Sequence, residues 1–97
     1  MTDIINFKAF EALTISNSEV GFTTATVGVN DHAFCTLEGA AIRFRLDGTA
    51  ASATVGHVLE PGDTLRLESG NELSNFRAFR RDGTDATLAS SFGVKGA

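Results

Sequence analysis

Histidine, cysteine and aspartate side chains are the residues of this sequence that would carry metal chemistry. The set comprises His32, His57, Asp31, Asp47, Asp63 and Cys35. Zinc and iron sites usually pair two ligands about two to five residues apart and take the others from elsewhere in the chain. The spacing here does not follow that pattern, which favours both histidines as exposed loop or turn residues. The sequence therefore predicts no metal and no cofactor.

Cysteine and serine are the candidate nucleophiles. Cys35 alternates with Phe34 and Thr36 on an expected strand, a position that suits a small buried hydrophobic side chain. A reactive thiol would need a histidine beside it and a lowered pKa. The serines stand in no Gly-x-Ser-x-Gly turn; the main ones are Ser52, Ser69, Ser90 and Ser91. These patterns predict no acyl-transfer chemistry.

Asp82 and Asp85 are the one carboxylate pair that resembles an acid–base couple. They flank an expected turn, where aspartate usually bonds its own backbone. A glycosidase pair would need a cleft and sugar-stacking aromatic residues, for which a chain of 97 residues has little room. We therefore expect a protein that is not an enzyme.

Arginine is the most informative charged residue, because six arginines outnumber two lysines. Two interpretations remain open: cross-strand ion pairs on a solvated face, or a polar interface between subunits, where arginine is the preferred cation. The arginines are Arg43, Arg45, Arg66, Arg77, Arg80 and Arg81. The expected interface residues are Ile4, Ile5, Phe7, Phe10, Arg43, Arg45, Arg77 and Phe79.

The elements that position these residues are organised around the stretch from Ala41 to Ser69. Ile42–Leu46 and Thr64–Glu68 alternate apolar and polar residues, which predicts two half-buried strands, and we expect them to be a central antiparallel pair. Glu60–Asp63 contains Pro and Gly at the two corners of a type II turn.

Other segments predict further short strands. Phe22–Val29 is rich in β-branched residues and is expected to form a hairpin with Ala33–Glu38. Phe76–Arg80 is expected to join Asp85–Val94 through a hairpin turn at Asp82–Gly83, with Ala86, Leu88, Ser90 and Phe92 pointing inward. Leu13–Ser16 adds a short strand, and Ser69–Asn75 is expected to be a polar connection. No segment shows the apolar spacing of a helix.

These elements predict an all-β fold: a single-domain antiparallel β-sandwich or small barrel of about seven to eight short strands. We expect residues 1–12 to be an N-terminal arm or edge strand, residues 13–94 the sandwich, and residues 95–97 a frayed C-terminus. The eight phenylalanines, with no Trp or Tyr, favour core filling over ligand stacking.

Composition excludes several classes of function. The formal net charge is −4, which argues against nucleic acid as a partner, and no apolar run approaches a membrane span. The single cysteine forms no intrachain disulfide, and the N-terminus lacks the pattern of a secretory signal. The expected product is a soluble protein made in a reducing cytoplasm.

Four segments in this order resemble small proteins of tailed bacteriophages that are found among virion assembly genes. They are Ile42–Thr49, Val55–His57, Phe76–Ala78 and Thr84–Leu88, and the similarity spans about Leu13 to Gly93. The resemblance implies a capsid-associated protein made in the host cytoplasm and carried on the virion surface. A trimeric cement or decoration protein that contacts the major capsid protein or other virion proteins is the expected type.

Two functions follow as expectations. The first is a non-enzymatic virion protein that oligomerises, with a trimer favoured, and stabilises the capsid shell through many modest contacts. The alternative is a minor head–tail or tail component that acts as a ligand- or carbohydrate-binding module, although sugar faces usually meet Trp and Tyr, which this chain lacks.

Overall fold

The computed structural model of the chain describes residues 5–95. Within them the chain forms seven strands and two short helical segments. The strands are β1 (Ile5–Ile15), β2 (His32–Glu38), β3 (Ile42–Arg45), β4 (His57–Leu59), β5 (Thr64–Leu67), β6 (Arg77–Arg80) and β7 (Ala86–Lys95). The helical segments are α1 (Thr24–Val27) and α2 (Gly70–Asn75).

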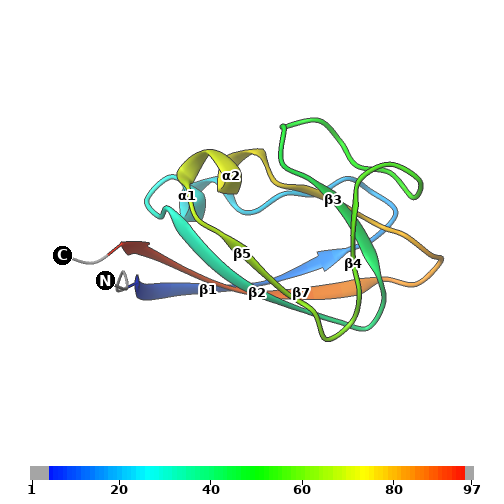
Figure 1. The fold of residues 1–97 in the computed structure, drawn as a ribbon, viewed down its shortest axis with the longest axis horizontal. Helices are drawn as coiled ribbons and strands as arrows, with labels where there is room; N and C mark the ends of the chain where they lie inside the picture. Colours follow the sequence, from blue (N-terminus) through cyan, green and yellow to red (C-terminus); the bar gives the residue numbers. More distant parts are fainter. Residues whose placement is uncertain (1–4, 96–97) are drawn as a thin grey trace.

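The strands build two antiparallel sheets that pack face to face as a sandwich, and no closed barrel forms. The four-stranded sheet has the order β1-β7-β2-β5, and the three-stranded sheet has the order β4-β3-β6. The long strands β1 and β7 lie side by side, and both described chain ends lie at the same end of the molecule (Figure 1). The sandwich alternative of the predicted all-β fold is therefore confirmed.

Phenylalanine rings fill the centre of the sandwich. Phe22 stacks on Phe76 at a centroid separation of 4.5 Å and meets Phe92 edge-on at 5.0 Å. Phe44 of β3 also stacks on Phe76, at a centroid separation of 5.8 Å. Because the rings come from both sheets and from a loop, they join the two layers through a continuous apolar contact.

Strand faces follow the predicted alternation. Ala86, Leu88, Ser90 and Phe92 of β7 all point inward and are buried. In β3, Ile42 and Phe44 are buried, whereas the two arginines between and after them are only partly covered. The predicted faces of these two strands are confirmed, because the period of two is a local property of an extended chain.

β1 is an edge strand that runs continuously through the boundary expected after residue 12. Ten of its residues pair with β7, from Ile5 opposite Lys95 to Ile15 opposite Ala86, with a bulge between Phe7 and Ala9. A Cβ atom on Gly93 would lie 2.2 Å from the carbonyl oxygen of Asn6, so glycine is required where the two strands approach at this bulge.

The expected central pair is wrong in its partners. β3 pairs with β4 and β6, whereas β5 pairs with β2 in the other sheet. The turn at Glu60–Asp63 forms as predicted, since the Asp63 N–H donates to the Glu60 carbonyl at 3.0 Å and Gly62 has a φ of +92°. This turn carries the chain from one sheet to the other, because a corner fixes the local path and leaves the pairing partner open.

The expected hairpin at Asp82–Gly83 is also wrong. β6 lies in the three-stranded sheet and β7 in the four-stranded sheet, so this turn also crosses between the layers. Arg80 on one side of the turn forms an ion pair with Asp85 on the other at 2.7 Å. The Asp-Gly corner thus bends the chain as expected, and the inward faces of the two strands then pack against each other across the core.

The predicted strand at Phe22–Val29 is wrong as well. Thr24–Val27 forms the single helical turn α1, Val29 is 66% exposed, and β2 takes β5 and β7 as its neighbours. Phe22 and Val27 are both buried, and Phe22 belongs to the central group of rings. The burial of these two side chains outweighs the β-propensity of the threonines. That propensity comes from packing against neighbouring strands, and this segment joins no sheet.

The connection expected at Ser69–Asn75 contains the helical segment α2. Ser69 begins it as the N-cap, where its hydroxyl accepts a hydrogen bond from the Glu72 N–H at 3.2 Å. Leu73 is its one buried residue and anchors the segment over the end of the sandwich. The expectation that the chain has no helix is therefore corrected to two short helical segments.

Candidate functional site: the outer faces of the two sheets

The outer face of the three-stranded sheet gathers four of the expected interface residues. Arg43 and Arg45 of β3 lie opposite Phe79 and Arg77 of β6, respectively, so all four side chains share the side of the sheet that points away from the core. Val58 of β4, which is 40% exposed, lies beside Arg43 and completes the surface. We call these five residues the arginine face.

Two of the three arginines on this face are paired with carboxylates of nearby loops. Arg45 donates to both carboxylate oxygens of Asp47, with an Nε to Oδ1 distance of 3.1 Å. This bonding, with a further bond from a backbone N–H, holds the pKa of Asp47 below its ordinary value. Arg77 pairs with Glu19 at 2.8 Å. Both guanidinium groups are therefore held in fixed orientations while they stay accessible.

Arg43 has a different role because it holds a loop in place. Its Nε donates to the Ala53 carbonyl oxygen and its Nη1 donates to the Gly56 carbonyl oxygen, both at 2.9 Å. Gly56 has a φ of +134°, and a Cβ there would lie 3.0 Å from the Phe44 carbonyl oxygen. Arg43 therefore holds the small-residue loop between β3 and β4 by two hydrogen bonds, and the lack of a side chain at Gly56 lets the loop lie close to β3.

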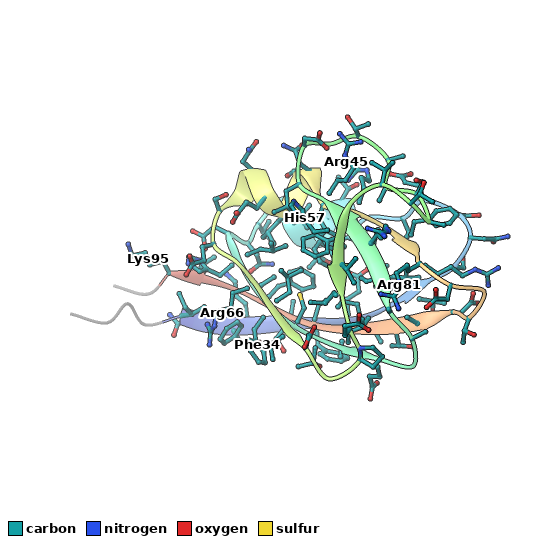
Figure 2. The ribbon with its side chains drawn as sticks, turned by 45° about the vertical axis from the view of Figure 1, so that its right-hand side comes forward. Phe34, Arg45, His57, Arg66, Arg81 and Lys95 are labelled. Atoms are coloured by element: carbon teal, nitrogen blue, oxygen red, sulfur yellow. The ribbon has the colours of Figure 1, made fainter. Side chains whose placement is uncertain are left out.

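A shallow open pocket lies beside the arginine face, between the ends of β3 and β4. Its volume is about 540 Å³. It is lined by Arg45, Leu46, Asp47, Gly56 and His57. Figure 2 shows Arg45 and His57 on this side of the molecule, and the imidazole lies 5.4 Å from the Phe44 ring. The pocket offers a guanidinium, a carboxylate and an imidazole to a polar ligand.

The outer face of the four-stranded sheet carries three phenylalanines. Phe10 of β1, Ser91 of β7, Phe34 of β2 and Arg66 of β5 lie in register across it. Phe10 is 67% exposed, and the Arg66 guanidinium lies over the Phe34 ring at 5.1 Å, as Figure 2 shows. With Phe7, which is 48% exposed, these residues form what we call the phenylalanine face.

The expected interface residues thus divide between opposite sides of the sandwich. Arg43, Arg45, Arg77 and Phe79 form the arginine face, whereas Phe7 and Phe10 lie on the phenylalanine face. Ile5, also on β1, is half-buried, and Ile4 lies outside the described residues.

Sequence reasoning missed Phe34 and Arg66 as surface partners. The alternation of their strands already placed both on an outer face. The pairing of β2 with β5 was the missing information.

The candidate catalytic side chains are used structurally. Cys35 is buried, and burial raises the pKa of its thiol to about 11 against an opposing hydrogen bond with Ser90. Asp82 and Asp85 form ion pairs with Arg81 and Arg80.

The remaining serines and the histidines lie at separate places in the fold, with Ser91 on the phenylalanine face between Phe10 and Phe34. Ser52 accepts hydrogen bonds from loop N–H groups, Ser69 caps α2, and Ser90 is buried in the core. His32 bonds Asp31 at 2.7 Å, which lowers the pKa of that carboxyl. Both histidines were expected to be exposed loop or turn residues. His57 is exposed at the pocket but begins strand β4, whereas His32 lies on β2 and is largely covered, so the prediction is wrong for His32 and holds only for the exposure of His57.

Within residues 5–95, no group of three or more His, Cys, Asp or Glu side chains is arranged to hold a metal ion. The same range contains no helix of the length and apolarity needed to cross a membrane. Comparison of the chain with models of protein families, with curated proteins and with solved structures finds no match.

Proposed function

We propose that this chain is a non-enzymatic structural protein of a tailed-phage virion, which binds and stabilises the capsid shell as a cement or decoration protein. The resemblance of four segments to small phage proteins supports the choice of partner. The observation that carries the proposal is the gathering of Arg43, Arg45, Arg77 and Phe79 on one outer sheet face.

The arginine face has the composition of a protein-binding surface. Arginine and aromatic residues are enriched at interfaces, and they form a large share of the residues that dominate binding energy. Arg45 and Arg77 are held by Asp47 and Glu19, so less side-chain entropy is lost when they meet a partner. A carboxylate of the shell would bind Arg45 or Arg77, either in place of the loop carboxylate or beside it. Phe79 would supply the apolar contact.

Binding to shells tests this proposal. The purified chain is mixed with undecorated shells of the phage that encodes it, and the pelleted protein and the shell melting temperature are measured. We expect saturable pelleting and a raised shell melting temperature. Phe79→Ser should weaken binding by about tenfold or more, as for an anchoring aromatic residue.

Val29→Ser is the matched control, because Val29 is an exposed apolar residue in the loop after α1 and belongs to none of the strands that form the arginine face. It should bind as the unchanged protein does. Absence of any bound protein on the shells would remove the proposal, and equal loss of binding in both variants would remove the assignment to the arginine face.

The pocket beside Arg45 favours a second candidate, a module that binds a polar ligand such as a carbohydrate. Arg45, Asp47 and His57 offer donors and acceptors in one open hollow. A glycan array with saturable binding that is abolished by His57→Ala would favour this function over the first. His57 lines the pocket and lies off the arginine face, so this variant separates the two functions.

A further inference from the structure

β1 has one free edge along its whole length. Its other edge pairs with β7, and no backbone hydrogen bond outside that ladder involves residues 5–15 in the described part of the chain. In an antiparallel strand, alternate residues point their N–H and C=O groups away from the neighbour. Such unpaired groups on a free edge can be complemented by another extended strand.

The other sheet edges are short or covered. β4 and β5 have three and four residues, and the edge of β6 is joined by Val20, which exchanges two backbone hydrogen bonds with Ala78. β1 has eleven residues. Its bulge between Phe7 and Ala9 interrupts the first part, which leaves Ala9–Ile15 as a regular edge of seven residues without proline.

Charge does not protect this edge from pairing. Glu11 is the one charged residue between Ala9 and Ile15. Its carboxylate accepts hydrogen bonds from the Thr23 hydroxyl at 2.8 Å and the Thr23 N–H at 3.4 Å, so it is held by a segment of its own chain. No lysine occurs in this stretch. Glu11 lies opposite the buried Ser90 and so points to the core-facing side of the sheet, but Thr23 already provides its hydrogen bonds.

We infer that a second copy of the chain adds to this edge, with the two β1 strands antiparallel about a two-fold axis. The two four-stranded sheets then join into one sheet of eight strands. This dimer differs from the trimer expected from the phage resemblance. When the same strand edge is used by both subunits, the contact has two-fold symmetry and leaves no edge of this kind for a third chain.

Charge and strand faces select the register of the pair. Opposed residues must lie on the same face, and an axis at Glu11 would place two carboxylates opposite each other, which is unfavourable. An axis at Ala12 uses all seven residues of the regular edge. It places Ala12 opposite Ala12 of the partner subunit, and Phe10 opposite Thr14 of the partner subunit, with no like charges facing.

The contact is modest in size. A strip of seven residues falls below the standard interface of about 800 Å² per partner, so we expect a dissociation constant in the micromolar range. Sedimentation equilibrium from about 1 µM to about 500 µM spans that range. The unchanged protein should shift from monomer to dimer across it.

Charges introduced at the axis test the register directly. Ala12 is exposed on the outer side of β1, so Ala12→Glu and Ala12→Lys should keep the fold and place like charges opposite each other. Each variant alone should remain monomeric. An equimolar mixture of the two should associate again, because opposite charges then face across the axis. Ala50→Glu makes the same charge change in an exposed loop and should dimerise normally.

The outcomes that would overturn this inference are a monomer at all concentrations, a trimer, dimerisation of Ala12→Glu equal to that of Ala50→Glu, or no association in the mixture. The inference is independent of the proposed function. A dimer that leaves shells undecorated would remove the function alone, and a monomer that binds shells would remove the dimer alone.

Discussion

Cys35 shows how a single side chain reports on the core. It lies on β2 opposite Ser90 of β7, and both residues are fully buried between the sheets. Burial disfavours the thiolate, so the thiol is protonated and unreactive at neutral pH. The alternation of Phe34, Cys35 and Thr36 already predicted a buried thiol. The identity of its neighbour depended on strand pairing, which local alternation does not encode.

We expect Cys35 to make stability depend on alkaline pH. Its pKa is about 11 in the folded protein and 9.0 ordinarily, so between these values the unfolded chain loses a proton that the folded chain keeps. The free energy of unfolding should therefore fall with rising pH by about 1.4 kcal/mol per unit in this window, beginning near pH 9.

Urea unfolding of the protein and of Cys35→Ala, measured from neutral pH to pH 11, checks this expectation. The variant should be less stable near neutral pH and should lack this part of the pH dependence. Parallel pH curves for the two proteins would contradict it, as would rapid alkylation of the native thiol at pH 7.

At the scale of elements, the approach of β1 and β7 depends on Gly93. A Cβ there would lie 2.2 Å from the Asn6 oxygen and 2.9 Å from the Phe7 Cα, both backbone atoms. Gly93→Ala should therefore shift the strand pair and lower the free energy of unfolding by about 1 to 3 kcal/mol. Gly83→Ala, which meets nothing within 4 Å, should change it by less than about 0.5 kcal/mol. Equal urea midpoints would show that the two strands do not approach in this way.

The N-cap of α2 provides a second test at this scale. Removing the Ser69 hydroxyl leaves the Glu72 N–H without its partner, so Ser69→Ala should cost about 1 kcal/mol of stability. Ser74→Ala, at an exposed position inside α2, should be neutral or slightly stabilising because alanine favours helix. The comparison uses thermal unfolding, and equal melting temperatures for the two variants would rule out the cap.

Elements could be predicted from the sequence where the signal is local. The inward faces of β3 and β7 and the turn at Glu60–Asp63 follow from alternation and from Pro and Gly. The cap of α2 was also readable, since Ser69 and Glu72 have the spacing of a capping box. A segment of six residues is too short for apolar helical periodicity, so that periodicity could not reveal it.

Pairing between strands was the part that could not be predicted. The corners at Glu60–Asp63 and Asp82–Gly83 look the same whether the chain turns back within one sheet or passes to the other. The choice depends on which apolar faces pack together, and the stacking of Phe22 on Phe76 and against Phe92 is a contact between distant segments. For the same reason, the sequence could not predict which residues form the arginine face and the phenylalanine face, because strand pairing decides which side chains lie side by side.

The whole molecule presents two unlike sheet faces and one open strand edge. The arginine face combines fixed cations with Phe79, and the phenylalanine face is largely uncharged. Such a body is suited to simultaneous contact with a large surface and with a second copy, and several weak contacts then give a strong attachment. These properties support the proposed role as a shell-binding protein.

Electron cryomicroscopy of undecorated shells incubated with the protein tests this account most directly. We expect additional density on the outer surface of the shell, into which the sandwich fits with the arginine face against the capsid and β1 toward a second copy. Shells without additional density would contradict the account. Density in which the molecule meets the capsid through the pocket or the phenylalanine face, with the arginine face in solvent, would contradict it as well.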